Sequence, residues 1–149
     1  MPLQFIPDLH RISSRLAASV ASGPTGELPI ADLLTLSILC DNEKFTVAGL
    51  QEQLGFAPST VSSILNRLER RKLIERQSSV KDRRTFHVSL TQDGVAAARG
   101  AREFLESLED RLTSQLSYAH VIAFSEVVEA LDKTLRPNPL PKRAKSATA

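Results

Sequence analysis

The sequence APSTVSSILNRLERRKLIERQSSVKDRRTFHVSLTQDG, residues 57–94, changes its periodicity halfway and so predicts two kinds of structure. In its first half the apolar residues recur at i, i+3, i+4 and i+7, as Val61, Ile64, Leu65 and Leu68. This spacing places them on one face of a helix. Pro58 fits the first turn, where a backbone N–H has no helical partner. The other faces are short, polar and rich in hydrogen-bond donors, which suits the major groove of duplex DNA.

The second half of the stretch changes to a period of two. A strand is expected to begin near Glu75, and a polar turn follows at residues 78–83. Apolar and polar residues then alternate over residues 86–90, with Phe86, Val88 and Leu90 as the apolar set. This alternation predicts a half-buried strand. Thr91 offers a side-chain oxygen to cap a following helix.

A short helix is expected just before this stretch. Thr46 can cap it, Val47, Leu50 and Leu54 form its inner face, and Gly55 is placed to end it in the left-handed conformation. Residues 55–58 are then the turn between two helices. Together with the strands that follow, the pattern predicts a winged helix-turn-helix.

Positive charge is concentrated in the same region. Residues 61–90 hold eight cations and three carboxylates, a local charge of +5, whereas the whole chain carries +2. The cations are Arg67, Arg70, Arg71, Lys72, Arg76, Lys81, Arg83 and Arg84. Such a local excess on a nearly neutral chain is typical of a phosphate-binding face. A winged-helix module that binds protein instead of DNA is the alternative interpretation, and charge reversal at Arg83 and Arg84 would distinguish the two.

Outside this lobe, long apolar stripes predict helices at both ends of the chain. Leu9, Ile12 and Leu16 form one stripe; Phe124, Val128, Leu131 and Leu135 form another. The fold class is therefore mainly α with a small β-hairpin wing, in a single domain over residues 1–136. We expect residues 30–92 to form the winged helix-turn-helix lobe, 8–22 and 93–135 to be dimerisation helices, and 137–149 to be a disordered basic tail. A symmetric homodimer would read a roughly palindromic operator.

The remaining composition argues against other classes of protein. Cys40 is the only cysteine, which excludes an intramolecular disulfide framework and fits a reducing cytoplasm; it is expected to be a small buried residue rather than an oxidation sensor. His10, His87 and His120 are too scattered to suggest a metal site. No signal peptide, membrane-spanning run, phosphate loop or nucleophile motif is found in the sequence, so neither an enzyme nor a cofactor is predicted.

The sequence resembles the MarR family of bacterial regulators over nearly its whole length. Residues 82–94, DRRTFHVSLTQDG, resemble the family's wing pattern, in which Asp-x-Arg leads into a strand ending in Leu-Thr, with a glycine shortly after. Residues 59–61 and 66–69 match the recognition helix, whereas residues 79–81 depart from the acidic residue and proline common in the family. The resemblance implies a dimeric repressor that is released by a small molecule or an oxidant. It also implies that Arg84 enters the minor groove and that Asp82 holds it.

The expected DNA-binding residues come from the recognition helix and the wing. They are Pro58, Ser59, Thr60, Ser62, Ser63, Asn66, Arg67, Lys81, Asp82, Arg83 and Arg84. Arg67 is expected at a base or a phosphate. The resemblance places the effector pocket between the dimer helices and the DNA-binding lobe, with the helix at 30–40 and the long helix after Thr91 as walls, and it identifies no ligand residue.

Overall fold

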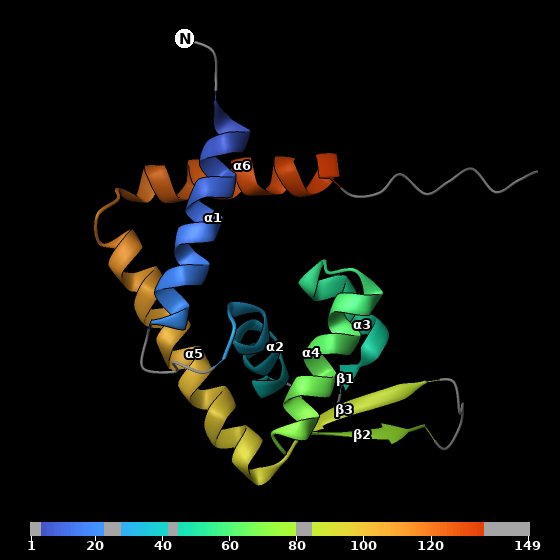
Figure 1. Ribbon diagram of the computed structural model, residues 1–149. Coiled ribbons are helices and arrows are strands. Elements are labelled where there is room, and N and C mark those ends of the chain that lie inside the picture. Colours follow the sequence, from blue (N-terminus) through green and yellow to red (C-terminus); the bar gives the residue numbers. More distant parts are fainter. Residues whose placement is uncertain (1–3, 23–27, 42–44, 80–84, 136–149) are drawn as a thin grey trace, which may run out of the picture. The chain divides into compact units, whose positions relative to one another are not determined.

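The computed structural model describes residues 4–22, 28–41, 45–79 and 85–135 (Figure 1). The chain divides into two compact units, residues 1–108 and 109–149, and each is described by itself. The described helices are α1 Phe5–Ala21, α2 Ile30–Cys40, α3 Val47–Leu54, α4 Pro58–Arg70, α5 Gln92–Thr113 and α6 Tyr118–Leu135. The described strands are β1 Phe45–Thr46, β2 Ile74–Ser78 and β3 Phe86–Leu90.

The first unit contains the predicted winged helix-turn-helix, with α3 and α4 as its two helices. The Oγ1 atom of Thr46 accepts a hydrogen bond from the Gly49 backbone N–H at 3.0 Å, so Thr46 caps α3 as expected. Gly55 ends α3 with φ of +65°, a conformation that glycine adopts without a Cβ penalty. Pro58 is the first residue of α4. The fold class predicted from the sequence is confirmed.

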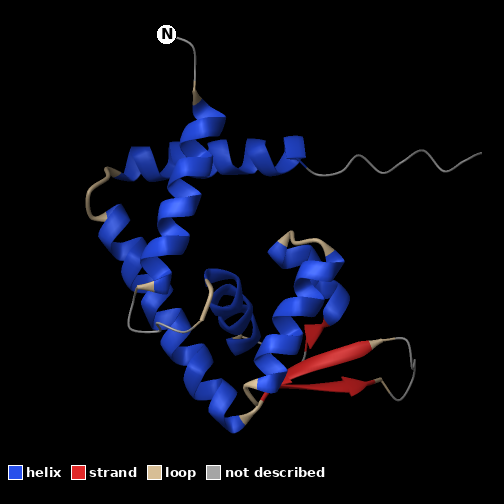
Figure 2. Ribbon diagram, viewed as in Figure 1, coloured by secondary structure: helices blue, strands red, loops and turns tan. Residues whose placement is uncertain are grey.

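The strands form one antiparallel sheet in the order β1-β3-β2 (Figure 2). Strand β1 was not predicted, because two residues are too few to show a period; it pairs Phe45 with Val88. The predicted burial of β3 was partly wrong. Val88 is fully buried, but Phe86 is 48% exposed. Phe86 pairs with Ser78 at the end of the hairpin away from Ile74 and Leu90, so it lies beyond the part of the sheet that packs on the core.

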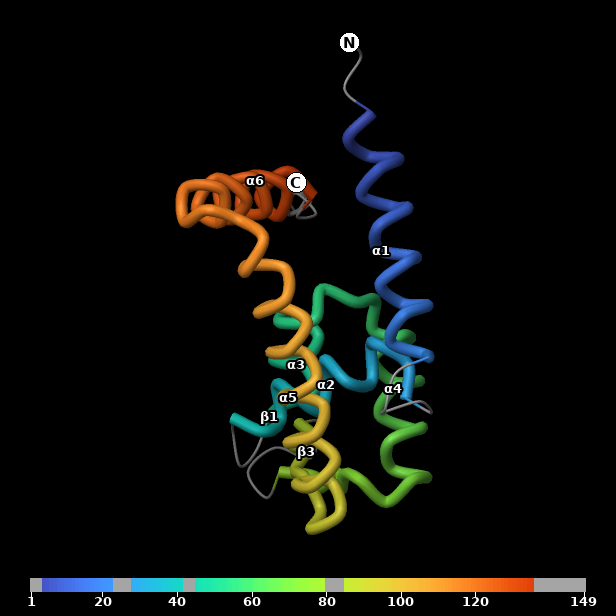
Figure 3. Tube along the Cα trace, turned by 90° about the vertical axis from the view of Figure 1, so that its left-hand side faces the viewer, coloured from blue at the N-terminus to red at the C-terminus, as the bar shows by residue number. Residues whose placement is uncertain are grey.

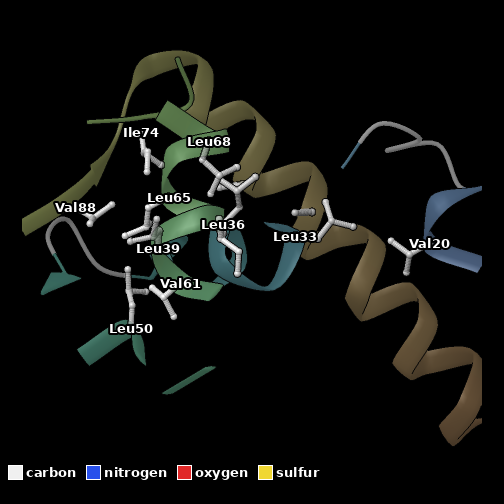
Figure 4. Packing of buried hydrophobic residues seen from close by; sticks show 13 residues of the cluster. Val20, Leu33, Leu36, Leu39, Leu50, Val61, Leu65, Leu68, Ile74 and Val88 are labelled. Carbon is white, nitrogen blue, oxygen red and sulfur yellow. The ribbon is translucent and has the colours of Figure 1, made fainter. Parts of the chain in front are cut away.

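The core of the first unit lies between α2, α4 and the sheet. Leu36 and Leu39 of α2 meet Leu65 and Leu68 of α4, and all four are no more than 1% exposed (Figure 4). The core is completed from other elements by Leu50, Ile74, Val88, Ala98, Ala101 and Val20. Because α4 contributes one full apolar face to this cluster, its opposite face is fixed toward solvent.

The start of α5 is joined to the segment that follows α4. The Thr91 hydroxyl accepts from the Gly94 N–H at 3.0 Å and donates to the Lys72 carbonyl at 2.7 Å. The Thr91 N–H donates to the Leu73 carbonyl at 3.1 Å. A Cβ atom on Gly94 would lie 1.8 Å from that carbonyl oxygen, so only glycine fits here. Thr91 therefore caps α5, as predicted, and also fixes the turn after α4.

The outer helices leave their apolar side chains exposed in the single chain. Val20 is the one buried residue of α1, and α6 has none among its described residues. Figure 3 shows α1 as one continuous helix, which begins at Phe5 and so precedes the predicted start at residue 8. Helix α5 ends at Thr113, and residues 114–117 separate it from α6. Among the described helices, none has the length and hydrophobicity needed to cross a membrane.

Candidate nucleic-acid interface

The outer face of α4 is polar and accessible along its whole length. Pro58, Ser59, Thr60, Ser62, Ser63 and Asn66 are all exposed. The opposite face is buried, and it is formed by Val61, Ile64, Leu65 and Leu68. The structure thus places the six predicted residues on one accessible surface, although contact between these side chains and DNA remains a prediction.

The N-terminus of α4 has no side-chain cap, unlike those of α3 and α5. Ala57 stands at the N-cap position and carries no hydrogen-bond acceptor in its side chain. Its backbone carbonyl accepts from Thr60 and Val61, at 2.9 and 3.1 Å. The positive end of the helix dipole is therefore left to solvent or to an anion. A phosphate oxygen is the anion that a recognition helix meets at this end.

Arg67 has a structural role that the sequence did not predict. Its Nε and Nη2 atoms donate to Oδ2 and Oδ1 of Asp32 at 3.0 and 2.5 Å. The Asp32 side chain is completely buried in α2, and the Arg67 side chain is 36% exposed. The hydrogen bonds with Asp32 raise the pKa of Arg67 above its ordinary value. Through these two hydrogen bonds Arg67 joins α4 to α2, and its contact with a base or a phosphate stays a prediction.

A second ion pair joins α4 to β2. The Arg76 Nε atom donates to Oε2 of Glu69 at 3.0 Å, and its Nη2 atom donates to the same oxygen. Nη2 also donates to Oδ1 of Asn66 at 2.7 Å. The hydrogen bonds from Arg76 lower the pKa of Glu69 below its ordinary value. One strand residue therefore positions two side chains of the helix.

These pairs change the charge available for binding phosphate. Arg67 and Arg76 are each paired with a carboxylate, and one of those carboxylates, Asp32, lies outside the stretch counted as +5. Arg70, Arg71 and Lys72 are exposed at the end of α4. The predicted wing residues Lys81, Asp82, Arg83 and Arg84 lie outside the described residues. A charge count along the sequence thus overstated the contribution of the helix.

Sequence reasoning missed both Asp32 and Arg76. A signal for Asp32 was present, because it is a lone carboxylate in an otherwise largely apolar helix, ADLLTLSILC at residues 31–40. A charge at such a position must be paired to be buried. Nothing in the sequence singled out Arg76 from the other cations around it.

A cavity of about 460 Å³ opens beside the same elements. It is lined by β1, α3, α4, β2 and β3, including Gln51, Ser62, Leu65, Arg76 and Phe86. The effector pocket was expected at the walls formed by α2 and α5, and this cavity is lined by neither. It lies within the winged helix-turn-helix lobe.

Cys40, which was expected to be buried, lies beside the Arg102 side chain. It is half-buried at the end of α2. Arg102 of α5 pairs with Asp41 and, at 3.1 Å, with Glu106. The pKa of Arg102 is raised, chiefly by the hydrogen bond with Asp41, then by the one with Glu106, and to a smaller extent by the Cys40 side chain. This network joins α2 to α5 within the first unit.

The comparisons with known proteins agree with this geometry. Residues 27–85 match the model of the MarR family. Over these residues the chain is similar to the MarR family. The winged-helix lobe just described is the part of the chain that carries the match.

Three relatives show how far the likeness extends. The organic hydroperoxide resistance transcriptional regulator of Bacillus subtilis is 39% identical over 62 residues, 42% of each chain. The HTH-type transcriptional repressor MdtR of the same organism is 29% identical over 106 residues, 71% of this chain and 64% of MdtR. The chain thus aligns with less than two thirds of either regulator. The solved structure of Bordetella bronchiseptica BpsR, whose DNA binding is regulated by 6-hydroxynicotinic acid, is 25% identical with a TM-score of 0.71, covering 83% of this chain and 95% of BpsR.

Proposed function

We propose that the chain is a homodimeric, sequence-specific DNA-binding transcriptional regulator, and that it acts as a repressor released by a small-molecule effector. The observation that carries the proposal is α4: an exposed polar face with an uncapped N-terminus, held on a buried core in a MarR family lobe. Relatives that are named regulators or repressors support it, as does BpsR, whose DNA binding responds to a small molecule.

The chemistry of α4 fits a major groove. Its hydroxyl and amide side chains match base edges, which present acceptors, donors and methyl groups. Its uncapped N-terminus and the exposed Arg70, Arg71 and Lys72 provide positive charge toward the phosphates on either side. By resemblance, the hairpin would add Lys81, Arg83 and Arg84 at the adjacent minor groove, with Asp82 orienting Arg84.

The dimer is proposed from the exposed apolar stripes of the outer helices. Leu9 is 41%, Ile12 58% and Leu16 41% exposed in α1. In α6, Phe124 is 58% and Leu135 71% exposed. Exposed stripes of this kind mark an interaction surface. A second copy of the chain would bury them and place two copies of α4 on successive major grooves.

The proposal is tested by selecting duplexes from a randomised library with the full-length protein and titrating the recovered sequence. We expect an approximately palindromic site. Affinity should fall by about a thousandfold or more between 50 and 200 mM salt, because a dimer that contacts roughly six to ten phosphates releases their counterions. Recovery of no preferred duplex, or a flat salt profile, would favour the winged-helix protein-interaction module instead.

A further inference from the structure

The side chain of Asn66 is held in one orientation by its neighbours. A guanidinium carries only donors, so only the Oδ1 end of the Asn66 amide can face Arg76. The observed contact, Nη2 to Oδ1 at 2.7 Å, is of this kind. The amide is therefore fixed with its oxygen toward β2 and its NH₂ group away from β2.

Arg76 is itself held in place by other contacts, so it can fix the orientation of the Asn66 amide. Its Nε and Nη2 atoms both donate to Oε2 of Glu69, one turn further along α4 from Asn66. The Arg76 side chain is 28% exposed, so it is packed as well as paired. The guanidinium bridges the helix and the strand, and the Asn66 oxygen is bonded to the fixed end of that bridge.

Asn66 also lies where a base can reach it. It is exposed, one helical turn from Ser62 and Ser63 on the outer face of α4. Within the described ranges, its Nδ2 atom donates to no other side chain. The group that Asn66 offers outward is thus a pair of N–H donors.

We propose that Asn66 is a specificity-determining residue that reads guanine, and that Arg76 is the positioning residue that sets this preference. The N7 and O6 atoms of guanine are adjacent acceptors, which suit an outward NH₂ group. Adenine is read by an asparagine whose oxygen and NH₂ group both face the base, but here the oxygen is bonded to Arg76. This inference rests on the proposed function, since it names what one residue of the recognition helix reads.

The test uses duplexes selected from a randomised library by the full-length wild type and by its variants. Asn66→Ala locates the position that Asn66 reads, because preference is lost there alone. At that position the wild type should favour guanine over adenine by about tenfold or more, the effect of one good contact. Asn66→Asp leaves only acceptors and should shift the preference toward cytosine, whose N4 group is a donor.

The role of Arg76 is tested by the ratio of guanine to adenine binding rather than by affinity, because a lost charge lowers affinity for every duplex alike. Arg76→Met should reduce this ratio severalfold. Glu69→Gln keeps Arg76 but loosens it, and should reduce the ratio less. The matched control is Arg70→Lys: Arg70 donates to the backbone oxygen of Asn66, at 3.3 Å, rather than to the Asn66 side chain, so the ratio should stay at the wild-type value.

Each contrary result is distinct. If the wild type selects a defined duplex but Asn66→Asp keeps the wild-type base ranking, Asn66 does not read guanine. The same conclusion follows if the wild type prefers adenine at that position. If both Arg76→Met and Glu69→Gln keep the wild-type ratio, Arg76 does not position the amide. If the wild type selects no duplex at all, the proposed function itself fails.

Discussion

Asp32 and Arg67 are 35 positions apart in the chain, and their side chains form a two-point ion pair between α2 and α4. The partners differ in their access to water. The Asp32 carboxylate is fully buried, whereas the Arg67 side chain is 36% exposed. The pair therefore joins α4 to α2 and occupies two donors of a residue that was predicted to contact DNA.

Because the two side chains differ in burial, removing each of them should lower the free energy of unfolding by a different amount. Arg67→Met should cost about 3–5 kcal/mol, because it leaves a buried carboxylate without a counter-charge. Asp32→Asn should cost less, about 1–2 kcal/mol, because an amide still accepts a hydrogen bond and Arg67 can reach water. Urea unfolding at one protein concentration measures both values. Equal costs, or the reverse order, would contradict the burial argument.

Two glycines of α5 form a matched pair. Gly94→Ala should destabilise the protein by about 1–3 kcal/mol, because the added Cβ would lie 1.8 Å from the backbone oxygen of Leu73. Gly100→Ala meets nothing within 4 Å and should stabilise the helix by about 0.5–1 kcal/mol. Thermal unfolding should move in opposite directions for the two variants. Similar shifts would show that the junction at Thr91 is not closely packed.

Acid should weaken the bridge between α4 and β2. The pKa of Glu69 lies below its ordinary value of 4.5, so the folded state binds this proton less tightly than the unfolded state does. The ion pair's contribution is complete above that ordinary value and is lost as the pH falls below it. Glu69→Gln should therefore be less stable than wild type at pH 7, with the difference shrinking below pH 4.5. In an Arg76→Met background that pH-dependent difference should disappear.

A charge in the apolar stripe of α6 should break the dimer. Leu131→Glu would place an unpaired carboxylate in the proposed contact, which is strongly unfavourable. Lys133→Glu adds the same group on the other face of α6, where Lys133 is 79% exposed and 4.0 Å from Glu129. Sedimentation at micromolar concentration should show monomers for Leu131→Glu and dimers for Lys133→Glu. A monomeric wild type would remove the dimer from the proposal.

The wing prediction rests on the sequence, because residues 80–84 lie outside the described ranges. On a strand, alternation would place Arg83 and Arg84 on opposite faces, and Asp82 on the same face as Arg84. Arg84→Lys should weaken operator binding clearly, since lysine keeps the charge but lacks the planar fork. Arg83→Lys should have a mild effect, and Asp82→Ala should weaken binding like Arg84→Lys. Tighter DNA binding by Asp82→Ala at every salt concentration would show that Asp82 only repels DNA.

The sequence was a good guide wherever structure is determined by local patterns. Helix α4 could be predicted because Val61, Ile64, Leu65 and Leu68 fall on one face, and Thr46 and Gly55 mark the ends of α3 by their own chemistry. The outer face of α4 followed directly from its buried face. These features depend on neighbours within a few residues, which a single sequence displays.

The pairings that refine the site could not be predicted in the same way. Which carboxylate meets Arg67 depends on how α2 packs on α4, and that packing is decided in three dimensions. Strand β1 is defined by its pairing with β3, in which Phe45 lies opposite Val88, more than forty positions away in the chain. A charge count along a segment treats every arginine as available, whereas Arg67 and Arg76, among the described residues, are paired with carboxylates.

The anchoring of α4 from both sides has a consequence for protein engineering. Its outer face belongs to the helix, but Asp32 and Arg76 come from elements before and after it. Transplanting residues 58–70 into another winged helix would carry Arg67 without its carboxylate and Asn66 without its guanidinium. The recipient would then have the predicted base-contacting side chains of α4 without the residues that position them. A successful transplant should therefore move residues 32 and 76 together with the helix.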